Sequence, residues 1–459
     1  MSMIDEILKE TPDTKACRLG PGVTEQAAEL FRGLFPDAKK ALVVDDVNTK
    51  RVSGDRVVAL LEKAGLEVAE YTINPDGSWF HATYDKVEEV REAVRAQLPA
   101  VPVAVGSGTI NDLVKRASEE VGVRYMVVGT AASMDGYTSY GAAITKDGMK
   151  QTLPCRAPLG ALVDSQVSAE APREMTASGY ADLLAKIPAG ADWILADAIA
   201  SALPELEKRG CERIHPLAWK CVQGPLRASL ANPAGVATGD EGEIRKLSEG
   251  LVMSAFAMQA SGTSRPASGT EHQVSHYWDM EDLCYEGKPV SHGFKVGIGT
   301  LASTATIEFL LEQDLTKLDV EASVAKWPKT FAELAATFPS VFGDRPDHIK
   351  RAEGEMAKKY STPDELRREL AFLKTAWPEL SKKLKAQVMP FDEVRACLKA
   401  VGAPYEPEMI GVSRAKFRET YRGVPYMRAR YFSLDLIARL GLMDELLDRL
   451  FGAGGVWQV

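Results

Sequence analysis

The sequence predicts an N-terminal α/β domain built on a parallel sheet, followed by an all-helical C-terminal domain. Between residues 41 and 165, short apolar runs alternate with helical patterns, which is the arrangement of βαβ units. After about residue 165 strand signals nearly vanish and helical patterns dominate. The length of 459 residues suits two or three domains. We therefore expect domains at residues 1–168 and 169–459, with the boundary close to Pro172.

Four strands are predicted in the first domain, with helical spacing between them. The strands are Ala41–Asp45, Glu67–Ile73, Val101–Val105 and Arg124–Val128. The run VPVAV at 101–105 is continuously apolar, as in a strand that is buried on both faces of a sheet. Helices are predicted at residues 55–65, 84–97, 110–120, 176–186, 190–207, 241–260, 292–313, 363–386 and 433–451.

Composition and charge exclude several classes of protein. The 55 basic and 64 acidic residues give a net charge of −9, which argues against a nucleic-acid binder. No stretch approaches the roughly 18 uncharged apolar residues of a membrane span. The start MSMIDEILKE carries acids where a signal peptide needs a basic start, so we expect a cytoplasmic protein. The six cysteines form no C-x-x-C pair and are expected to be free thiols.

A glycine turn follows the third predicted strand and precedes a helix. Gly106-Ser107-Gly108-Thr109 would let backbone N–H groups approach a phosphate closely at the helix N-terminus. The alternative is an ordinary β–α turn, which every parallel sheet needs. Position 111 is Asn, so the G-x-G-x-x-G dinucleotide fingerprint is not met.

A second polar loop, VGTAASMDGYTSY at 128–140, follows the fourth predicted strand. Open α/β sheets bind ligands at the carboxyl ends of their strands, at a switch point. A single loop of this kind is also typical of a polar surface. Two such loops on neighbouring strands favour a ligand site. The polar side chains concerned are those of Thr130, Ser133, Asp135, Thr138 and Ser139.

Three of the six histidines fall within 21 residues of each other. His272 and His276 are four residues apart and share a face if the segment is helical, and His292 begins another predicted helix. With a carboxylate, such as that of Asp182, these nitrogens suit zinc, nickel or ferrous iron. Isolated H-x-x-x-H pairs are also found as surface or capping histidines. Spacing along the chain does not place Asp182 beside the histidines.

Taken together, five segments resemble the sn-glycerol-1-phosphate dehydrogenases. These belong to the superfamily of 3-dehydroquinate synthase, glycerol dehydrogenase and the iron-containing alcohol dehydrogenases. Trp278 and Glu281, after the second histidine, make the pattern most similar to the bacterial members. The segments are GSGTIND at 106–112, TAASMDGYTS at 130–139, GYADLLAKIPAGADW at 179–193, EHQVSH at 271–276 and SHGFKVGIGT at 291–300.

The resemblance implies a dehydroquinate synthase-like fold: a Rossmann-like N-terminal domain, a helical C-terminal domain and an active site in the cleft between them. Asp182, His272 and His292 would bind one divalent metal, with zinc or nickel favoured over iron. His276 and Asp135 would contact substrate, as would Asp182. A homodimer or a larger homo-oligomer is expected. The residues implied for the dinucleotide are Gly106, Ser107, Gly108, Thr109, Ile110, Thr130, Ser133 and Ser139.

Two features depart from the family pattern. Ser107 replaces the middle one of three glycines that are usual in the turn, and residues 330–459 match no motif of the family. The chemistry is therefore better indicated than the substrate. The main interpretation is interconversion of dihydroxyacetone phosphate and sn-glycerol 1-phosphate. A glycerol or other polyol dehydrogenase and a catalytically silent binding protein are alternatives.

A further alternative is a dehydroquinate or cyclitol synthase-like lyase with catalytic NAD. Relatives of that type usually carry Glu at the first metal position, followed by Lys, whereas this chain has Asp182, with Lys186 one turn later. That difference favours the dehydrogenase.

NAD(H) is expected in preference to NADP(H). Asp46 would accept hydrogen bonds from the ribose hydroxyls and repel a 2′-phosphate, and Asp45 is its alternative. A phosphorylated substrate would need cationic partners, for which Arg265, Lys295 and Lys186 are candidates. The alternative for Arg265 and Lys295 is a solvated surface charge.

Overall fold

The computed structural model describes residues 3–146 and 149–459, which divide into two compact units. The first unit comprises Met1–Leu183, Leu217–Ser264 and Ala400–Gly402. The second comprises Leu184–Pro216, Arg265–Lys399 and Ala403–Val459. Each unit therefore takes in segments that are far apart along the chain.

A six-stranded parallel sheet forms the centre of the first unit, in the order β1-β8-β5-β4-β2-β3. Its strands are β1 (Ala16–Gly20), β2 (Lys40–Asp46), β3 (Glu67–Ile73), β4 (Val101–Gly106), β5 (Met126–Gly129) and β8 (Gly160–Asp164). The four predicted strands are present. Sequence reasoning missed β1 and β8, and also the antiparallel hairpin of β6 (Ala142–Lys146) and β7 (Met149–Leu153).

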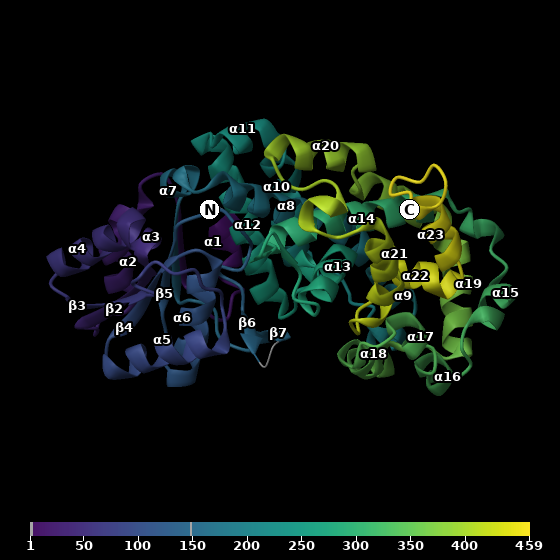
Figure 1. The fold of residues 1–459 in the computed structure, drawn as a ribbon, viewed down its shortest axis with the longest axis horizontal. Helices are drawn as coiled ribbons and strands as arrows, with labels where there is room; N and C mark the ends of the chain where they lie inside the picture. Colours follow the sequence, from purple (N-terminus) through teal and green to yellow (C-terminus); the bar gives the residue numbers. More distant parts are fainter. Residues whose placement is uncertain (1–2, 147–148) are drawn as a thin grey trace. The chain divides into compact units, whose positions relative to one another are not determined.

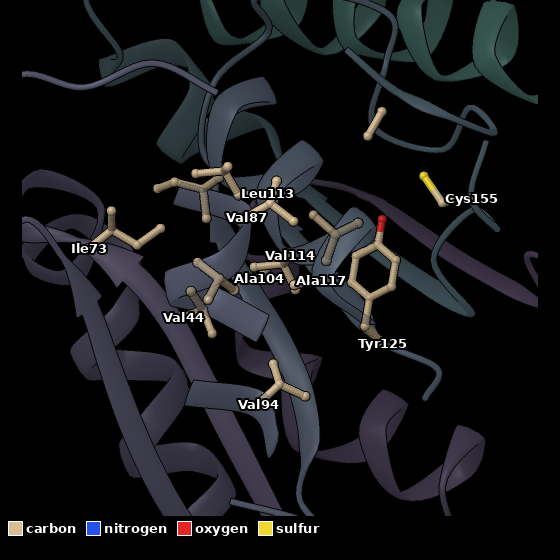
Figure 2. Packing of buried hydrophobic residues seen from close by; sticks show 14 of the residues in the cluster. Val44, Ile73, Val87, Val94, Ala104, Leu113, Val114, Ala117, Tyr125 and Cys155 are labelled. Atoms are coloured by element: carbon tan, nitrogen blue, oxygen red, sulfur yellow. The ribbon is translucent and has the colours of Figure 1, made fainter. Parts of the chain in front are cut away.

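The side chains of β2 alternate between two hydrophobic clusters, one on each face of the sheet. Leu42 and Val44 belong to one cluster, and Ala41 and Val43 belong to the other, because successive side chains of a strand point to opposite faces. Helices α5 (Tyr84–Ala96) and α6 (Gly108–Val121) cover the first face, and α2 (Ala27–Leu34) and α4 (Asp55–Lys63) cover the second. Figure 2 shows the first cluster, to which Val87 and Val94 of α5 and Val44 of β2 all belong.

The strand order places a switch point between β2 and β4. From β2 the chain moves outward to β3, and then crosses back to β4 on the other side of β2 (Figure 1). Ligands of open α/β sheets bind at such a point, outside the carboxyl ends of the strands. Here those ends are Asp45–Asp46 and Gly106, which begin two of the predicted cofactor segments.

Helices of the first unit outside the sheet layer include α8, which carries Asp182, and α12, which returns to this unit from later in the chain. Their bounds are α1 (Met3–Ile7), α3 (Val47–Thr49), α7 (Ser165–Glu170), α8 (Arg173–Leu184), α10 (Pro216–Ser229), α11 (Pro233–Thr238) and α12 (Glu241–Ser261).

The second unit is helical apart from one short hairpin, in agreement with the predicted all-helical character. Its helices are α9 (Lys186–Ala202), α13 (Thr270–Asp279), α14 (His292–Glu312), α15 (Val320–Lys326), α16 (Phe331–Ala335), α17 (Phe338–Phe342), α18 (Pro346–Lys359), α19 (Pro363–Gln387), most of α20 (Phe391–Val401), α21 (Arg414–Gly423), α22 (Ser433–Leu440) and α23 (Met443–Phe451). The hairpin pairs β9 (Cys284–Tyr285) with β10 (Lys288–Pro289).

The predicted helix at 433–451 is in fact two helices, because Gly441 adopts a left-handed conformation (φ 73°) that ends α22. Helix α14 is the one helix among the described residues with the length and apolarity of a membrane span. However, 83% of its most apolar window is buried, as in the core helix of a globular unit.

Candidate active site

The predicted phosphate turn lies at the switch point of the first unit. Strand β4 ends at Gly106, and α6 begins at Gly108 with Ser107 as its N-cap, whose side chain makes no capping hydrogen bond. The first-turn N–H groups of Gly108, Thr109 and Ile110 therefore begin a helix at the carboxyl edge of the sheet. That is the arrangement in which a helix N-terminus binds an anion.

The second predicted loop begins beside this turn and is fastened to α6. The Thr130 N–H donates to the Gly106 carbonyl at 3.2 Å. The buried Lys115 ammonium donates to the carbonyls of Gly136 and Gly141 at 3.1 and 3.0 Å. The Asn111 amide reaches the Tyr137 carbonyl at 3.3 Å. Sequence reasoning used Asn111 only as a mismatch to a fingerprint; the structure shows that Asn111 and Lys115 hold the loop.

Asp135, in this loop, is hydrogen-bonded to Asp182 on α8. The Asp135 N–H donates to Oδ2 of Asp182 at 3.0 Å, and the Ser254 hydroxyl on α12 donates to Oδ2 of Asp135 at 2.8 Å. Asp182 is fully buried. No spacing in the sequence relates Ser254 to Asp135, because 119 residues separate them.

A glycine allows α8 to approach the loop this closely. A Cβ at Gly179 would lie 2.0 Å from the carbonyl oxygen of Ala132, far inside van der Waals contact. Since Gly179 is one turn before Asp182 on the same helix, its lack of a side chain brings this end of α8 against the loop.

The two acids at the end of β2 have different surroundings. Oδ1 of Asp46 accepts the N–H groups of Asn48 and Thr49, each at 2.8 Å, and so caps α3. Asp45 is fully buried and accepts a hydrogen bond of 2.8 Å from Thr72. Burial raises the pKa of Asp45 to about 6. Asp46 is the more exposed of the two carboxylates, as alternation along a strand requires.

The three predicted histidines come together in the second unit. The ring centroids of His272 and His292 lie 5.4 Å apart, and those of His272 and His276 lie 6.4 Å apart. His292 is the first residue of α14, whose N-cap is Ser291. A Cβ at Gly299 of α14 would lie 2.3 Å from the carbonyl oxygen of Glu271 on α13. The two helices can therefore pack this closely only because residue 299 is a glycine. This close packing brings His292 to His272.

Buried acids contact two of these rings. Nδ1 of His272 lies 2.8 Å from Oε1 of Glu271. Nδ1 of His276 lies 3.4 Å from Oδ2 of Asp279, and Asp279 also pairs with the Lys295 ammonium. The His276 side chain remains 45% exposed. Its partial burial lowers the pKa of the imidazole, and the charge of Arg428 adds to this lowering while Asp279 opposes it.

The three cationic side chains considered for a substrate phosphate are buried. Arg265 is 1%, Lys295 5% and Lys186 0% exposed, so a solvated surface charge is excluded for each. Arg265 donates to the carbonyls of Tyr431 and Asp192 at 2.8 and 2.6 Å, which gives it a structural role. Lys295 is engaged with Asp279.

Sequence comparison supports the resemblance. The family model of iron-containing alcohol dehydrogenases matches residues 18–172. The chain is 34% identical over 263 residues to a Halalkalibacterium halodurans protein named glycerol-1-phosphate dehydrogenase (NAD(P)+), and that alignment spans 57% of this chain but only 63% of the relative. A Bacillus subtilis protein of the same name is 34% identical over 274 residues, covering 60% of this chain and 67% of the relative.

One longer alignment includes the C-terminal region, for which the sequence suggested no motif. A Bacillus licheniformis protein of the same name is 28% identical over 420 residues, or 91% of this chain and 87% of the relative. Among solved structures, a probable glycerol dehydrogenase from Sinorhizobium meliloti superposes with a TM-score of 0.57 at 16% identity, covering 95% of this chain and 97% of that one. This second likeness concerns the fold alone.

Proposed function

The chain belongs to the glycerol-1-phosphate dehydrogenase family, within the iron-containing alcohol dehydrogenases, and from that premise we propose that it interconverts dihydroxyacetone phosphate and sn-glycerol 1-phosphate using NAD(P). In the reducing direction, NAD(P)H would supply a hydride for the ketone carbon and a proton would add to its oxygen, so that the products would be the alcohol and NAD(P)+. A cytoplasmic location and a homodimeric state remain predictions.

The proposed cofactor site is the switch point of the first unit. The N–H groups of Gly108–Ile110 would bind the pyrophosphate, and Ser107 has a hydroxyl that is not used for capping. Thr130 and Ser133, with Ser139, would line the same site. Asp46 would accept from the ribose hydroxyls, which favours NAD(H) over NADP(H).

The proposed metal ligands are Asp182, His272 and His292. Together they offer one carboxylate oxygen and two imidazole nitrogens, a donor set that fits zinc, nickel or ferrous iron. The paired rings of His272 and His292, one of them held by a buried carboxylate, are the observation that carries this proposal. When bound, a divalent ion would act as a Lewis acid on the substrate oxygen.

The remaining site residues would position substrate and protons. His276, half-exposed and backed by Asp279, would contact a substrate hydroxyl and exchange a proton with it. Asp135, whose carboxylate accepts a hydrogen bond from Ser254, would form a further hydrogen bond to the substrate. Exclusion of water around these groups would strengthen each of these contacts.

The test is a substrate and metal matrix on the purified full chain. We expect oxidation of NADH by dihydroxyacetone phosphate after addition of zinc, nickel or iron, with formation of sn-glycerol 1-phosphate and not its enantiomer. Removing the substrate phosphate should lower kcat/KM by at least about tenfold, since charge-assisted hydrogen bonds contribute about 1.5–3 kcal/mol each.

Three outcomes would overturn the proposal. Equal turnover of dihydroxyacetone or glycerol would indicate a polyol dehydrogenase. Conversion of a phosphorylated sugar acid or heptulose with only catalytic NAD would indicate a synthase. Tight binding of NAD(H) with no turnover of any ketone would indicate a silent binding protein.

A further inference from the structure

Glu271, immediately before His272, is a buried acid beside a proposed metal ligand. Its side chain is 0% exposed. Oε1 lies 2.8 Å from Nδ1 of His272 and also accepts the Gly269 N–H at 2.5 Å. Within the described part of the chain, Oε2 has no hydrogen-bond partner. The ring of His272 is therefore one of two polar groups that this carboxylate contacts.

The position of Glu271 is fixed from several directions. Gly299 of α14 packs against its backbone, where any side chain would clash with the Glu271 carbonyl. Before it, Asp192 accepts the N–H of Thr270 at 2.7 Å. The carboxylate is thus held in place by the chain around it, and no rearrangement is needed for it to meet the ring.

We propose that Glu271 is a positioning residue that fixes the tautomer of His272, with the proton on Nδ1 and the lone pair on Nε2, the nitrogen that would bind a metal ion. An ionised carboxylate has no proton to donate, so in its contact with Glu271 the ring nitrogen Nδ1 is the donor. In water the Nε2–H tautomer of imidazole side chains is the usual one. The protein therefore supplies the opposite tautomer, and a carboxylate partner also raises the basicity of the ligand nitrogen.

This inference rests on the proposed function only for the identity of the group at Nε2. The tautomer is a property of the protein without metal, and it can be measured directly. Nitrogen NMR of metal-free protein distinguishes a protonated from an unprotonated ring nitrogen. The His272→Ala variant assigns the signal among the six histidines.

We expect the Nδ1–H form in the wild type, the Nδ1–H form in Glu271→Gln, and a loss of this preference in Glu271→Ala. The amide oxygen of glutamine can still accept from the ring, whereas alanine leaves Nδ1 to water. Asp192→Asn is the matched control, because it disturbs the same loop through Thr270 without touching the ring. Its His272 should keep the Nδ1–H form.

A second readout is affinity for Zn²⁺, measured by competition with a chromogenic chelator. Loss of such a carboxylate typically weakens metal binding by roughly 10–100-fold. We expect a loss of that size in Glu271→Ala and a smaller loss in Glu271→Gln. The spectrum of the Co²⁺-loaded protein should change in Glu271→Ala and not in Asp192→Asn, which separates positioning from general loosening of the loop.

The two proposals fail in different ways. An Nε2–H tautomer of His272 in metal-free wild type overturns the role of Glu271, whatever the protein binds. Unchanged Zn²⁺ affinity in Glu271→Ala, with metal still bound, overturns it as well. A wild type with the Nδ1–H tautomer but no affinity for any divalent ion refutes the metal site in the proposed function and leaves the positioning of His272 intact.

Discussion

The backbone N–H of Asp135 donates a hydrogen bond of 3.0 Å to Oδ2 of Asp182. This bond joins the loop after β5 to the proposed metal ligand on α8, so the two segments depend on each other. Ser254 fixes the side chain of Asp135 from a third element, α12. A change at Asp182 therefore has a structural effect that is separate from any effect on metal binding.

Two substitutions at Asp182 separate these effects. Asp182→Asn keeps an oxygen that can accept the Asp135 N–H, but it removes the charge; we expect a near-native melting temperature with most bound metal and activity lost. Asp182→Ala also leaves a buried N–H without its partner, at a cost of about 1–3 kcal/mol. Thermal unfolding and elemental analysis check both. Full metal content in Asp182→Asn would contradict its role as a ligand.

The three histidines should differ in their effects. His272→Ala and His292→Ala are expected to remove most bound metal and nearly all activity while the fold survives. His276→Ala should retain metal and lose turnover, because we assign it to substrate. Chelation should inactivate the wild type and a divalent ion should restore it. If His276→Ala lost metal as His272→Ala does, the division between metal and substrate roles would be wrong.

In the first unit, the sequence predicts well those elements whose pattern lies within a few consecutive residues. Strand β4 and its glycine turn are visible because VPVAV is continuously apolar. Strands β1 and β8 were missed because five-residue segments such as ACRLG carry little pattern of their own. Strand β1 gains stability by pairing with β8, and β8 by pairing with β1 and β5. A β-strand of that length is defined by its neighbours more than by its sequence.

The candidate site shows the same limit. Asp135, Asp182 and the histidines were named from motifs, whereas Ser254 and Lys115 hold the site through contacts that no sequence spacing shows. Glu271 was inside a quoted motif without a role. The available signal was a carboxylate directly before a proposed metal-binding histidine. The burial of that carboxylate is visible only in the structure, where α14 packs against α13.

Cofactor preference can be tested without losing the helix cap at Asp46. Asp46→Asn removes the charge but retains an oxygen that can cap α3, since asparagine is as good an N-cap as aspartate. We expect the ratio of kcat/KM for NADPH to that for NADH to rise by roughly tenfold, as two like charges close together repel by about 1–4 kcal/mol. Asp46→Ala should show the same shift with about 1 kcal/mol of stability lost. Equal use of both cofactors by the wild type would count against Asp46.

Asp45 should make stability depend on pH. Its pKa is raised to about 6 by burial, against which the Thr72 hydrogen bond and Lys50 act only in part. The unfolded chain titrates near 3.9, so above about pH 6 the folded protein carries a buried charge that the unfolded chain bears more easily. As the pH falls from about 6 to about 4, protonation in the folded state relieves this destabilisation.

Asp45→Asn should therefore stabilise the protein above about pH 6, by about 1–3 kcal/mol, and the gain should shrink toward pH 4. Denaturant unfolding of both proteins across this pH range measures the difference between their free energies of unfolding. Because the other titratable groups are the same in both proteins, their contributions cancel in this difference. An asparagine variant that is less stable than wild type at pH 7, or a difference that does not vary with pH, would contradict a raised pKa of Asp45 in the folded protein.

The contact between α8 and the loop after β5 predicts a strong effect of a single methyl group at Gly179. An alanine Cβ there would lie 2.0 Å from the Ala132 carbonyl oxygen and 2.8 Å from its carbon, and backbone cannot move aside as a side chain can. We expect Gly179→Ala to lose about 1–3 kcal/mol of stability, as overpacked sites do, and to lose activity because α8 carries Asp182.

Gly354→Ala is the matched control: this glycine is exposed in the middle of α18, and its Cβ would meet nothing within 4 Å. There the better helix propensity of alanine should add about 0.5–1 kcal/mol. Melting temperatures that move in opposite directions in the two variants support the close approach at Gly179, and a Gly179→Ala variant as stable and active as wild type would refute it.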